Sequence, residues 1–580
     1  MFVLRRALPG FVCGLFCGIV LKGAFGNLGL GLVVGAILGV AYALVLPRPH
    51  GTCDDGVSAD RAMTAAAFGL PIWGALNVIL LPLLAGRMPQ WSAEGMRTLF
   101  PALVSWLLFG FALGLLATGA VSLAERLFGV APASPAPATP EVKTRVVILG
   151  GGFAGVSAAM NLEKEFRDDP GVSFTLVSET NALLFTPMLA EVAASSLEPT
   201  HISAPLRSSL HRTRVLRSRV ASIDLETRCV RLDDREGTLP YDHLVLALGA
   251  VSSLPPGDGI AEQALDFKTL VDAIRIRNHV IDAFDRADAE LDTARRRALL
   301  TFVVAGGGFS GAELVGGLND FTRGMLADYP NLSADELRIV LVHSRDRILP
   351  ELSASLANYA LERMRARGVT FELNARLSAA RPGIVVIRRK GSENIDASPN
   401  AESTEVEIPT ETLVWTAGAA PNPLLKELDI DRDKRGGVLV ENTLAVPRHN
   451  GLWALGDCAV VPHGKTGKPC PPTAQFAIRQ ARTLARNLRA SIYGKPLKPF
   501  RFDSLGTLCV VGHHTACAEI KGHKFSGFFA WLLWRGIYLS KLPGLERKVR
   551  VLGDWTVELF FPRDIVQTID FGVRGEQPRS

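Results

Sequence analysis

The sequence predicts an α/β protein with two parallel-sheet domains, preceded by an all-α domain of four helices. Two observations predict the sheets: a short buried strand, a glycine-rich turn and an apolar helix follow one another near residue 145 and again near residue 300. The third observation is that long uncharged stretches fill the first 130 residues. Together they indicate two Rossmann-like dinucleotide-binding domains behind a four-helix transmembrane domain.

The N-terminal stretches predict membrane-spanning helices. They cover residues 7–21, 23–47, 62–86 and 98–124, and none contains Asp, Glu, Lys, Arg or His. The last three exceed the about 20 residues that a helix needs to cross the hydrocarbon core, and a hairpin turn is expected at 22–27. Arg5 and Arg6 favour a cytoplasmic N-terminus, so four spans leave the rest of the chain on the cytoplasmic side of the inner membrane. Without internal charges, this domain is predicted to be an anchor or assembly module, not a pump.

Composition excludes several classes of protein. The net charge of +6 and the lack of a basic tract interleaved with aromatic residues argue against a nucleic-acid partner. The eight cysteines form no C-x-x-C pair, which argues against a zinc site and a disulfide scaffold. We therefore expect no metal site and a reducing compartment.

The first glycine-rich turn is the motif around which the chain is organised. After a predicted strand at 146–149, Gly150, Gly152 and Gly155 supply the spacing G-x-G-x-x-G. Such glycines allow a tight turn, close approach of a pyrophosphate and close helix–strand packing, with the phosphates at the positive end of the helix. Glu179, after the next strand, is placed to accept hydrogen bonds from a ribose.

The second copy reads LTFVVAGGGFSGAELVGGL from residue 300, with Gly306, Gly308 and Gly311 at the same spacing. A helix is expected to follow, with Glu313 in its first turn. Two fingerprints predict two nucleotides, such as a flavin and a nicotinamide, or one duplicated fold. His343 occupies the position where a ribose-binding acid is expected, and an arginine follows it, so NADH and NADPH both stay open.

Two later strands end in glycine. Residues 241–250 (YDHLVLALGA) contain Gly249, and residues 450–458 (NGLWALGDC) place Gly456 and Asp457 after a short apolar strand. The combination of two fingerprints with a late Gly-Asp favours a flavin contact at this position. The alternative is an ordinary turn.

Three other stretches have simpler interpretations. Residues 183–194 are apolar and compatible with core packing, and the polar residues 391–411 are predicted to form an exposed loop. Residues 528–542 predict a helix in the membrane interface, and the alternative is a buried core helix. Three aromatic residues of that helix are expected at the lipid headgroups: Trp531, Trp534 and Tyr538.

With these motifs established, residues 144–567 resemble the type II NADH:quinone oxidoreductases, the single-subunit, non-pumping NADH dehydrogenases of the FAD-dependent pyridine nucleotide-disulfide oxidoreductase superfamily. The resemblance rests on GGGFAG, FTPML, YDHLVLALG, GGGFSGAEL, LVWTAGAAPNP, LWALGDCA, PPTAQFAIRQA and AWLLWRGIYLSKL. It implies electron transfer from NADH, with NADPH left open, through FAD to a membrane quinone. The four N-terminal spans lie outside the usual pattern of this family.

The resemblance also implies a flavin domain in two parts, with a nicotinamide domain inserted between them. The expected boundaries are 1–130 for the transmembrane domain, 131–143 for a Pro/Ala-rich linker, 144–265 and 421–500 for the FAD domain, 266–420 for the NAD(P)H domain and 501–580 for a membrane-docking region. The sequence leaves open whether the chain forms a homodimer.

Individual roles follow from the same resemblance. The residues expected to hold FAD are Gly150, Gly152, Phe153, Ala154, Gly155, Glu179, Gly249, Gly456, Asp457, Ala474 and Gln475. NAD(P)H is expected at Gly306, Gly308 and Gly311. Three residues are expected to serve catalysis, with Glu313 near the flavin and Gln475 and Arg479 where the quinone arrives. Arg479 departs from the family pattern, because many members have a second Gln there.

Two other functions are compatible with these motifs. A sulfide:quinone oxidoreductase shares the fold but needs redox cysteines at the flavin, and Cys229, Cys458 and Cys470 show no suitable pattern. The other is a non-catalytic, flavin-bearing redox sensor or assembly scaffold that uses the N-terminal helices.

Overall fold

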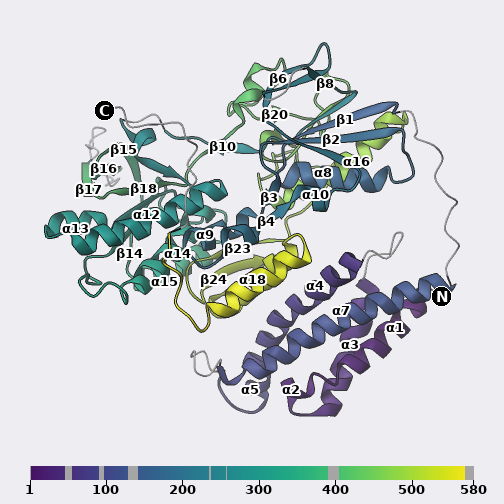
Figure 1. Ribbon diagram of the computed structural model, residues 1–580, viewed down its shortest axis with the longest axis horizontal. Helices are drawn as coiled ribbons and strands as arrows, with labels where there is room; N and C mark the ends of the chain where they lie inside the picture. Colours follow the sequence, from purple (N-terminus) through teal and green to yellow (C-terminus); the bar gives the residue numbers. More distant parts are fainter. Residues whose placement is uncertain are drawn as a thin grey trace.

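In a computed structural model, a bundle of N-terminal helices is followed by two α/β units, with a further antiparallel sheet and two helices near the C-terminus (Figure 1). The structure describes residues 2–45, 55–89, 97–128, 142–233, 237–255, 258–389 and 404–567. The linker predicted at 131–143 lies outside these residues, except for its last two positions.

The N-terminal region contains four main helical runs, as predicted. These are α1 (Phe2–Cys17), α3 (Leu28–Val45), the continuous run of α4 (Asp55–Trp73), the π-helical η1 (Gly74–Leu80) and α5 (Leu81–Leu84), and α7 (Phe100–Phe128), with the short α2 (Lys22–Phe25) at the predicted hairpin turn. Arg61–Leu84 and Phe100–Ala120 are long and apolar enough to cross a membrane. The apolar parts of the other two helices, Ala7–Cys17 and Leu28–Leu44, are shorter.

Helices α1 and α3 pack with their backbones in contact because glycines line both of them. A Cβ atom on Gly14 would lie 2.2 Å from the carbonyl oxygen of Gly35, and one on Gly39 would lie 2.2 Å from that of Gly10. Small residues at every fourth position permit such close approach. The glycines at every fourth position therefore allow α1 and α3 to pack closely within this chain.

The first parallel sheet has the strand order β21-β9-β1-β2-β5. Its strands are β1 (Thr144–Leu149), β2 (Val172–Ser178), β5 (Thr213–Arg217), β9 (His243–Leu246) and β21 (Leu452–Ala454). Helix α8 (Phe153–Glu165) packs against β1 and β2, and α16 (Ala474–Ile492) packs against α8. Because β21 follows the second glycine-rich turn in sequence, the chain leaves this sheet and later returns to it.

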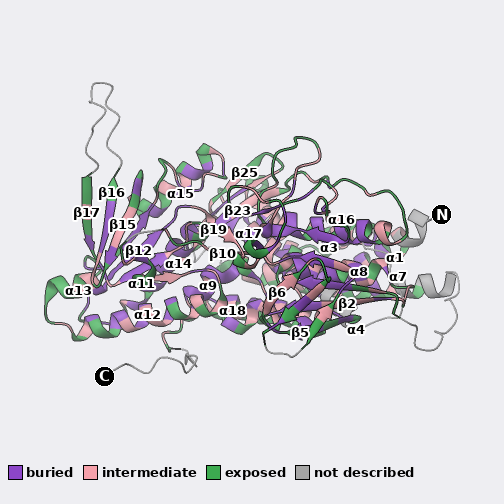
Figure 2. Cartoon of the chain, turned by 90° about the horizontal axis from the view of Figure 1, so that it is seen from above, coloured by how far each residue is buried: buried purple, intermediate pink, exposed green. Residues whose placement is uncertain are grey.

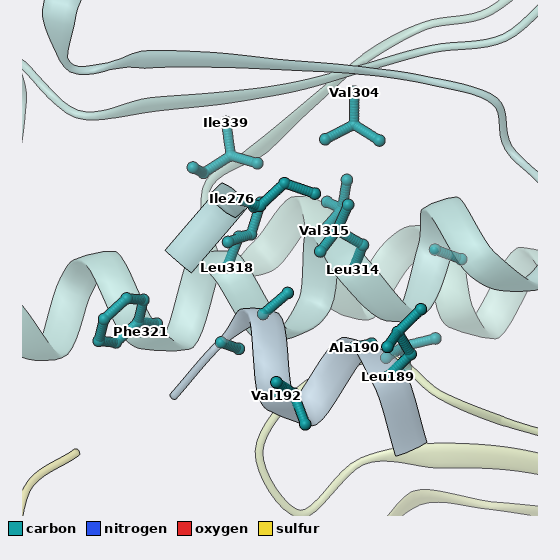
Figure 3. Packing of buried hydrophobic residues seen from close by; sticks show 14 of the residues in the cluster. Leu189, Ala190, Val192, Ile276, Val304, Leu314, Val315, Leu318, Phe321 and Ile339 are labelled. Atoms are coloured by element: carbon teal, nitrogen blue, oxygen red, sulfur yellow. The ribbon is translucent and has the colours of Figure 1, made fainter. Parts of the chain in front are cut away.

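The second parallel sheet has the order β11-β18-β12-β13-β14. Its strands are β11 (Ala264–Asp266), β12 (Thr301–Ala305), β13 (Arg338–Val342), β14 (Val369–Glu372) and β18 (Thr412–Trp415), and the helices α12 (Leu270–Ala289) and α14 (Phe309–Met325) pack near it. Figure 3 shows α14 between the sheet residues Val304 and Ile339 on one side and the short α9 (Leu189–Ala193) on the other. The apolar stretch at 183–194 therefore does contribute to the core, as predicted.

One predicted loop is partly a strand. Residues 404–409 form β17 (Thr404–Pro409), which pairs antiparallel with β16 (Ile384–Arg389), itself paired with β15 (Ala375–Arg381). The prediction of a loop over 391–411 is wrong for this part, because these residues pair with β16 and bury Ile408. The rest of β17 is mostly exposed, as Figure 2 shows. Residues 391–403 lie outside the described residues.

The C-terminal region forms the antiparallel sheet β23 (Gly506–Val510), β24 (Ala516–Ile520) and β25 (His523–Ser526), followed by α17 (Gly527–Lys541) and α18 (Leu545–Val557). Helix α17 contacts both β24 and α4. Trp531 and Trp534 are only 7% and 1% exposed, and Trp531 shares a core cluster with Trp73 and Trp106 of the N-terminal bundle. The expectation that these aromatic residues face lipid headgroups is therefore wrong. The N-terminal helices cover Trp531, and Trp534 and Tyr538 pack in the core of the α/β part.

The smaller elements connect these parts. They are β3 (Ala182–Leu184), η2 (Thr186–Met188), η3 (Pro199–Ile202), β4 (Ser203–Pro205), α10 (Leu206–Ser209), β6 (Val220–Asp224), β7 (Cys229–Leu232), β8 (Thr238–Pro240), β10 (Ala250–Ser252), α11 (Ile260–Gln263), α13 (Thr293–Leu299), α15 (Ala354–Ala366), β19 (Ala419–Pro421), η4 (Pro423–Glu427), β20 (Val438–Leu439), η5 (Gly456–Cys458) and β22 (Ala459–Val460).

Candidate functional site

The first glycine-rich turn lies at the carboxyl edge of the first sheet, between β1 and α8. Gly150 has a φ of +114°, and a Cβ atom on Gly155 would lie 1.9 Å from the carbonyl oxygen of Gly150. Gly152 caps α8 without a side-chain hydrogen bond, and no heavy atom lies within 4 Å of the place its Cβ would take. The turn is thus closed on one side and open in front of the helix N-terminus, which fits a pyrophosphate.

Other predicted residues lie at the same edge, because the carboxyl ends of parallel strands meet there. Glu179 follows β2, and its exposed carboxylate is 3.4 Å from the guanidinium of Arg219. Gly249 follows β9 with a φ of +64°. The structure therefore brings the first turn, Glu179 and Gly249 to one edge of the sheet.

The Gly456–Asp457 turn completes this edge. Gly456 has a φ of +74°, and its N–H donates to Oε1 of Gln480 over 2.9 Å. Burial raises the pKa of Asp457, and the nearby Lys268 opposes that shift. Sequence reasoning missed Gln480, which is buried on α16 and holds the turn in place. Its position one helical turn after Phe476, on the buried face of α16, is the signal that could have identified it.

The second glycine-rich turn repeats the geometry of the first. Gly306 has a φ of +120°, and a Cβ atom on Gly311 would lie 1.8 Å from its carbonyl oxygen. Gly308 caps α14, again with no heavy atom within 4 Å of its Cβ position. His343 packs against this turn, and its Nδ1 accepts a hydrogen bond from the N–H of Gly307 over 3.0 Å. Burial lowers the pKa of His343, so a neutral imidazole occupies the position where an acid was expected.

Glu313 is the fifth residue of α14 and belongs to its second turn, which corrects the expected first-turn position. Its Oε1 accepts a hydrogen bond from the N–H of Val510 over 3.3 Å. Burial raises the pKa of Glu313 to about 8, and the nearby carboxyl of Glu191 contributes to the rise. Glu313 therefore holds a proton at neutral pH, as a buried acid can when it takes part in proton transfer.

Gln475 and Arg479 lie at the start of α16, whose first residue is Ala474. Both N–H groups of the Gln475 amide are engaged, with Ser504 Oγ at 3.0 Å and the Gly506 carbonyl at 3.2 Å. Arg479 donates to the carbonyl of Gln475 over 2.8 Å, and its guanidinium carbon lies 4.2 Å from the centre of the Phe502 ring. Within the described part of the chain, no carboxylate forms an ion pair with Arg479.

Glu313 lines a cavity that this pair does not line. A cavity of about 40 Å³ is lined by Glu313, Glu191 and Pro187, but by neither Gln475 nor Arg479. A series of ring contacts leads from the first glycine-rich turn toward this cavity. The series runs from Phe153 to Phe185 (5.8 Å between ring centres), from Phe185 to Tyr538 (6.1 Å) and from Tyr538 to Trp534 (4.8 Å).

Comparisons with known proteins identify the family. Residues 144–481 match the pyridine nucleotide-disulphide oxidoreductase family, and residues 505–564 match the NDH2 C-terminal domain. The type II NADH:quinone oxidoreductase Ndh of Mycobacterium tuberculosis is 31% identical over 448 residues, which cover 75% of this chain and 92% of that protein. The external alternative NADH-ubiquinone oxidoreductase of Yarrowia lipolytica is 27% identical over 499 residues, covering 75% of this chain and 82% of that protein.

Solved structures share the fold. NDH2 from Plasmodium falciparum in complex with NADH superposes with a TM-score of 0.66 at 18% identity, covering 73% of this chain and all of that one. The sulfide:quinone oxidoreductase of Aquifex aeolicus gives 0.54 at 16% identity, covering 68% and 90%. The fold alone does not separate the two activities. The two activities are separated by the family match over more than half of the chain and by the 31% identical relative. The chain belongs to the type II NADH:quinone oxidoreductases of the pyridine nucleotide-disulphide oxidoreductase family.

Proposed function

We propose that the chain oxidises NADH at FAD held by the first sheet and passes the electrons to a membrane quinone. The observation that carries this proposal is the pair of equivalent glycine-rich turns, each open in front of a helix N-terminus. One site suits the pyrophosphate of a flavin nucleotide and the other that of a nicotinamide nucleotide. FAD, when bound, supplies the hydride acceptor and the two-electron donor for the quinone.

The residues at the first edge fit FAD. Gly150, Gly152 and Gly155, with Phe153 and Ala154 at the start of α8, would hold the pyrophosphate. Glu179 would accept hydrogen bonds from the ribose, Gly249 would let the backbone pass close to the flavin, and Asp457 on the turn held by Gln480 would contact the ribityl chain. Gly306, Gly308 and Gly311 would hold NADH in the same way.

The two-part FAD domain is also a proposal. The return of β21 to the first sheet supports a split domain at 144–265 and 421–500 around an NADH domain at 266–420. Strand β11 (Ala264–Asp266) pairs with β18 of the second sheet, so we place the first boundary just before residue 264.

The quinone is proposed to meet the flavin near Gln475 and Arg479. Burial and the charge of Arg482 lower the pKa of Arg479, and Lys541 on α17 has a pKa lowered by burial and by Arg479. We propose that Arg479, with Lys541 as a second positive charge, would act on the negative charge that develops on a reduced quinone.

Arg479→Ala is expected to slow reoxidation of the reduced flavin by quinone about 10-fold or more, because a charge-assisted contact is lost. Gln475→Ala should have a smaller effect, since its amide already bonds to Ser504 and Gly506. Reduction by NADH, measured separately by stopped-flow absorbance, should be unchanged in both variants. If reduction is the slowed step, or if both variants reoxidise normally, these residues do not form the quinone site.

The N-terminal helices are proposed to anchor the enzyme in the cytoplasmic membrane, with the catalytic part on the cytoplasmic side. Alkaline carbonate strips peripheral proteins, whereas spanning helices resist it. We expect the protein to stay in the membrane fraction after a carbonate wash and to need detergent for release. Release by carbonate would contradict the anchor. Deleting residues 1–143 would not test the membrane anchor alone, because the deletion would also expose Trp531 and Leu532 of α17.

A sulfide:quinone oxidoreductase is disfavoured by the buried thiol next to Asp457. Cys458 donates to the carbonyls of Leu246 and Leu455, and burial raises its pKa to about 11, so it is not a ready nucleophile. Steady-state reduction of a short-chain quinone with NADH, NADPH or sulfide tests the proposal. We expect turnover with NADH. Turnover with sulfide alone would favour the sulfide enzyme, and bound flavin without turnover would favour a redox sensor.

A further inference from the structure

Helix α4 packs lengthwise against the two C-terminal helices of the α/β part. Near its start, Lys548 of α18 donates to Thr64 Oγ1 over 2.8 Å. Where α4 continues into η1, a Cβ atom on Gly74 would lie 2.7 Å from the side chain of Leu532 on α17. Between these two contacts the helix rises about 15 Å, which is half of the hydrocarbon core of a bilayer.

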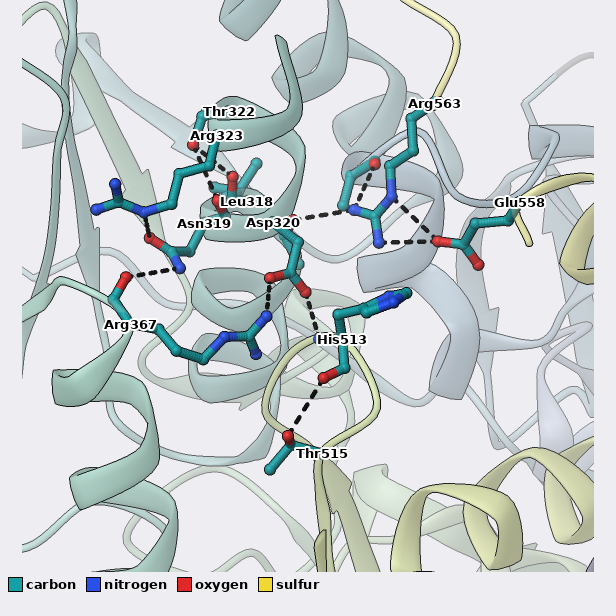
Figure 4. Close-up of polar contacts among 12 residues, drawn as sticks. Leu318, Asn319, Asp320, Thr322, Arg323, Arg367, His513, Thr515, Glu558 and Arg563 are labelled. Atoms are coloured by element: carbon teal, nitrogen blue, oxygen red, sulfur yellow. Dashed lines mark hydrogen bonds and ion pairs between the residues drawn. The ribbon is translucent and has the colours of Figure 1, made fainter. Parts of the chain in front are cut away.

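Ion pairs fix α17 and α18 to the α/β part. Glu558, which caps the end of α18, pairs with Arg535 of α17 (2.8 Å) and with Arg563 (2.9 Å). Arg563 donates in turn to the carbonyls of Ala194 (3.1 Å) and Gly317 (3.2 Å), and Figure 4 shows it beside Glu558. The surface that holds α4 therefore belongs to the catalytic part of the chain.

Charged residues lie beside the middle of the apolar run that includes α4. Gly74 is near the middle of Arg61–Leu84, and Phe529 of α17 lies 3.8 Å from the Cβ position of Gly74. The edge strand β25 ends directly before α17 and carries the exposed His523 and Lys524. If the run crossed the bilayer, this strand would lie within the hydrocarbon, where charges and unpaired strand edges are unfavourable. The run therefore does not span the bilayer while it packs on α17.

The opposite side of the bundle exposes apolar side chains. Helix α4 packs against α7, and α7 packs against α1 and α3, which lie on the side away from the α/β part (Figure 1). Val33 and Ile37 of α3 are 58% and 64% exposed, and an apolar surface of this kind indicates contact with a membrane or a partner. The apolar parts of α1 and α3, Ala7–Cys17 and Leu28–Leu44, rise about 16 Å and about 25 Å, so both are shorter than the hydrocarbon core.

The basic residues in the turns of the bundle also oppose a spanning arrangement. Lys22 begins α2, Arg87 follows α5 and Arg97 precedes α7, and all three are exposed. Four spans with a cytoplasmic N-terminus would move all three across the membrane, against the preference of basic loops for the cytoplasmic side. A bundle that stays on one side keeps them at the cytoplasmic headgroups, where anionic lipids attract them.

We infer that the N-terminal bundle lies along one leaflet of the membrane, with α1 and α3 among its acyl chains and α4 against the catalytic part. The partner of the outer face is the lipid of the leaflet nearest the catalytic part, and no helix of the bundle reaches the other side. The inference rests on the proposed membrane anchor and specifies its geometry. An apolar hairpin embedded in one leaflet also resists a carbonate wash, so that wash tests the anchor and not its geometry.

The side of the membrane on which residue 88 lies tests this geometry. Met88, after α5, is 82% exposed, and Leu291, between α12 and α13, is 93% exposed. Met88→Cys and Leu291→Cys, each in the full chain, are treated with a membrane-impermeant maleimide in sealed right-side-out and inverted vesicles. The wild type gives the background from its own cysteines. We expect both variants to react in the same vesicle orientation and to lose the reaction in the other.

Reaction of the two variants in opposite orientations would overturn the inference, because a helix would then cross the bilayer. Failure of Met88→Cys to react before detergent is added would also overturn it, since the inferred geometry leaves residue 88 in water.

The double variant Val33→Arg/Ile37→Arg tests whether lipid covers the outer face of α3. It places two charges one helical turn apart on that face. The share of protein retained in the membrane after a carbonate wash should fall about 10-fold or more, because arginine is unfavourable among acyl chains. FAD content and flavin reduction by NADH should match the wild type. The control Val271→Arg/Leu291→Arg adds the same charges at exposed positions of the α/β part and should leave retention unchanged.

Wild-type retention in Val33→Arg/Ile37→Arg would overturn the lipid contact, and a smaller particle in detergent would then assign the face to a protein partner. If this variant purifies without flavin, Phe16→Arg on the exposed side of α1 decides by the same measure. Its retention should also fall, and wild-type retention would overturn the lipid contact. Release of the wild type by carbonate would instead reject the proposed anchor.

Discussion

Gly152→Val should yield a folded but colourless protein. The backbone at Gly152 (φ −82°, ψ −171°) is extended, a conformation that valine favours, and no heavy atom lies within 4 Å of the new Cβ. The side chain fits the protein itself but occupies the place where the pyrophosphate must approach the N-terminus of α8. We expect the FAD content, measured by the flavin absorbance of purified protein, to fall to about one-tenth or less.

Two further variants make this result specific. Gly553→Val places the same side chain at another open, exposed position on α18 and should keep FAD. Gly155→Ala is a poor test, because its Cβ would lie 1.9 Å from the Gly150 carbonyl and would disturb the turn itself. If Gly152→Val purifies yellow with normal FAD content, the first turn does not bind the flavin.

Gly308→Val should separate the two nucleotides. Its position matches that of Gly152 in geometry, with an extended backbone and open space in front of α14. We expect the variant to stay yellow and to be reduced by dithionite, while its KM for NADH rises about 100-fold, because the valine side chain takes the place where the pyrophosphate would bind. Loss of FAD with unchanged NADH kinetics would reverse the assignment of the two turns.

The sequence predicts those parts of the fold that depend on patterns within a few neighbouring residues. Apolar runs and glycine spacing identified the strands of both fingerprints, and the predicted strand at 146–149 lies within β1. Strand β17 was missed because its pattern of one buried residue among exposed ones becomes meaningful only beside β16. The assignment of α17 to the membrane interface was wrong for a related reason. Its aromatic residues suit headgroups and cores equally well, and only packing against α4 and the α/β core decides between them.

The site residues also divide into those with a local sequence pattern and those that depend on distant parts of the chain. The glycines of both turns were found because their role depends on backbone geometry within a few residues. Gln480 and Glu191 were missed because their roles depend on which face of a helix points inward and on charges brought from distant segments. Glu191 stands within an apolar run that reads as core, and only the structure places it opposite Glu313.

Anaerobic stopped-flow spectroscopy of the wild-type enzyme shows whether electrons pass from NADH through the flavin to quinone. The enzyme should be mixed in turn with NADH, NADPH and sulfide, and the reduced enzyme should then be mixed with a short-chain quinone. We expect one equivalent of NADH to bleach the flavin and quinone to restore its colour. Bleaching by sulfide but not by NADH, or reduced flavin that quinone fails to reoxidise, would contradict it.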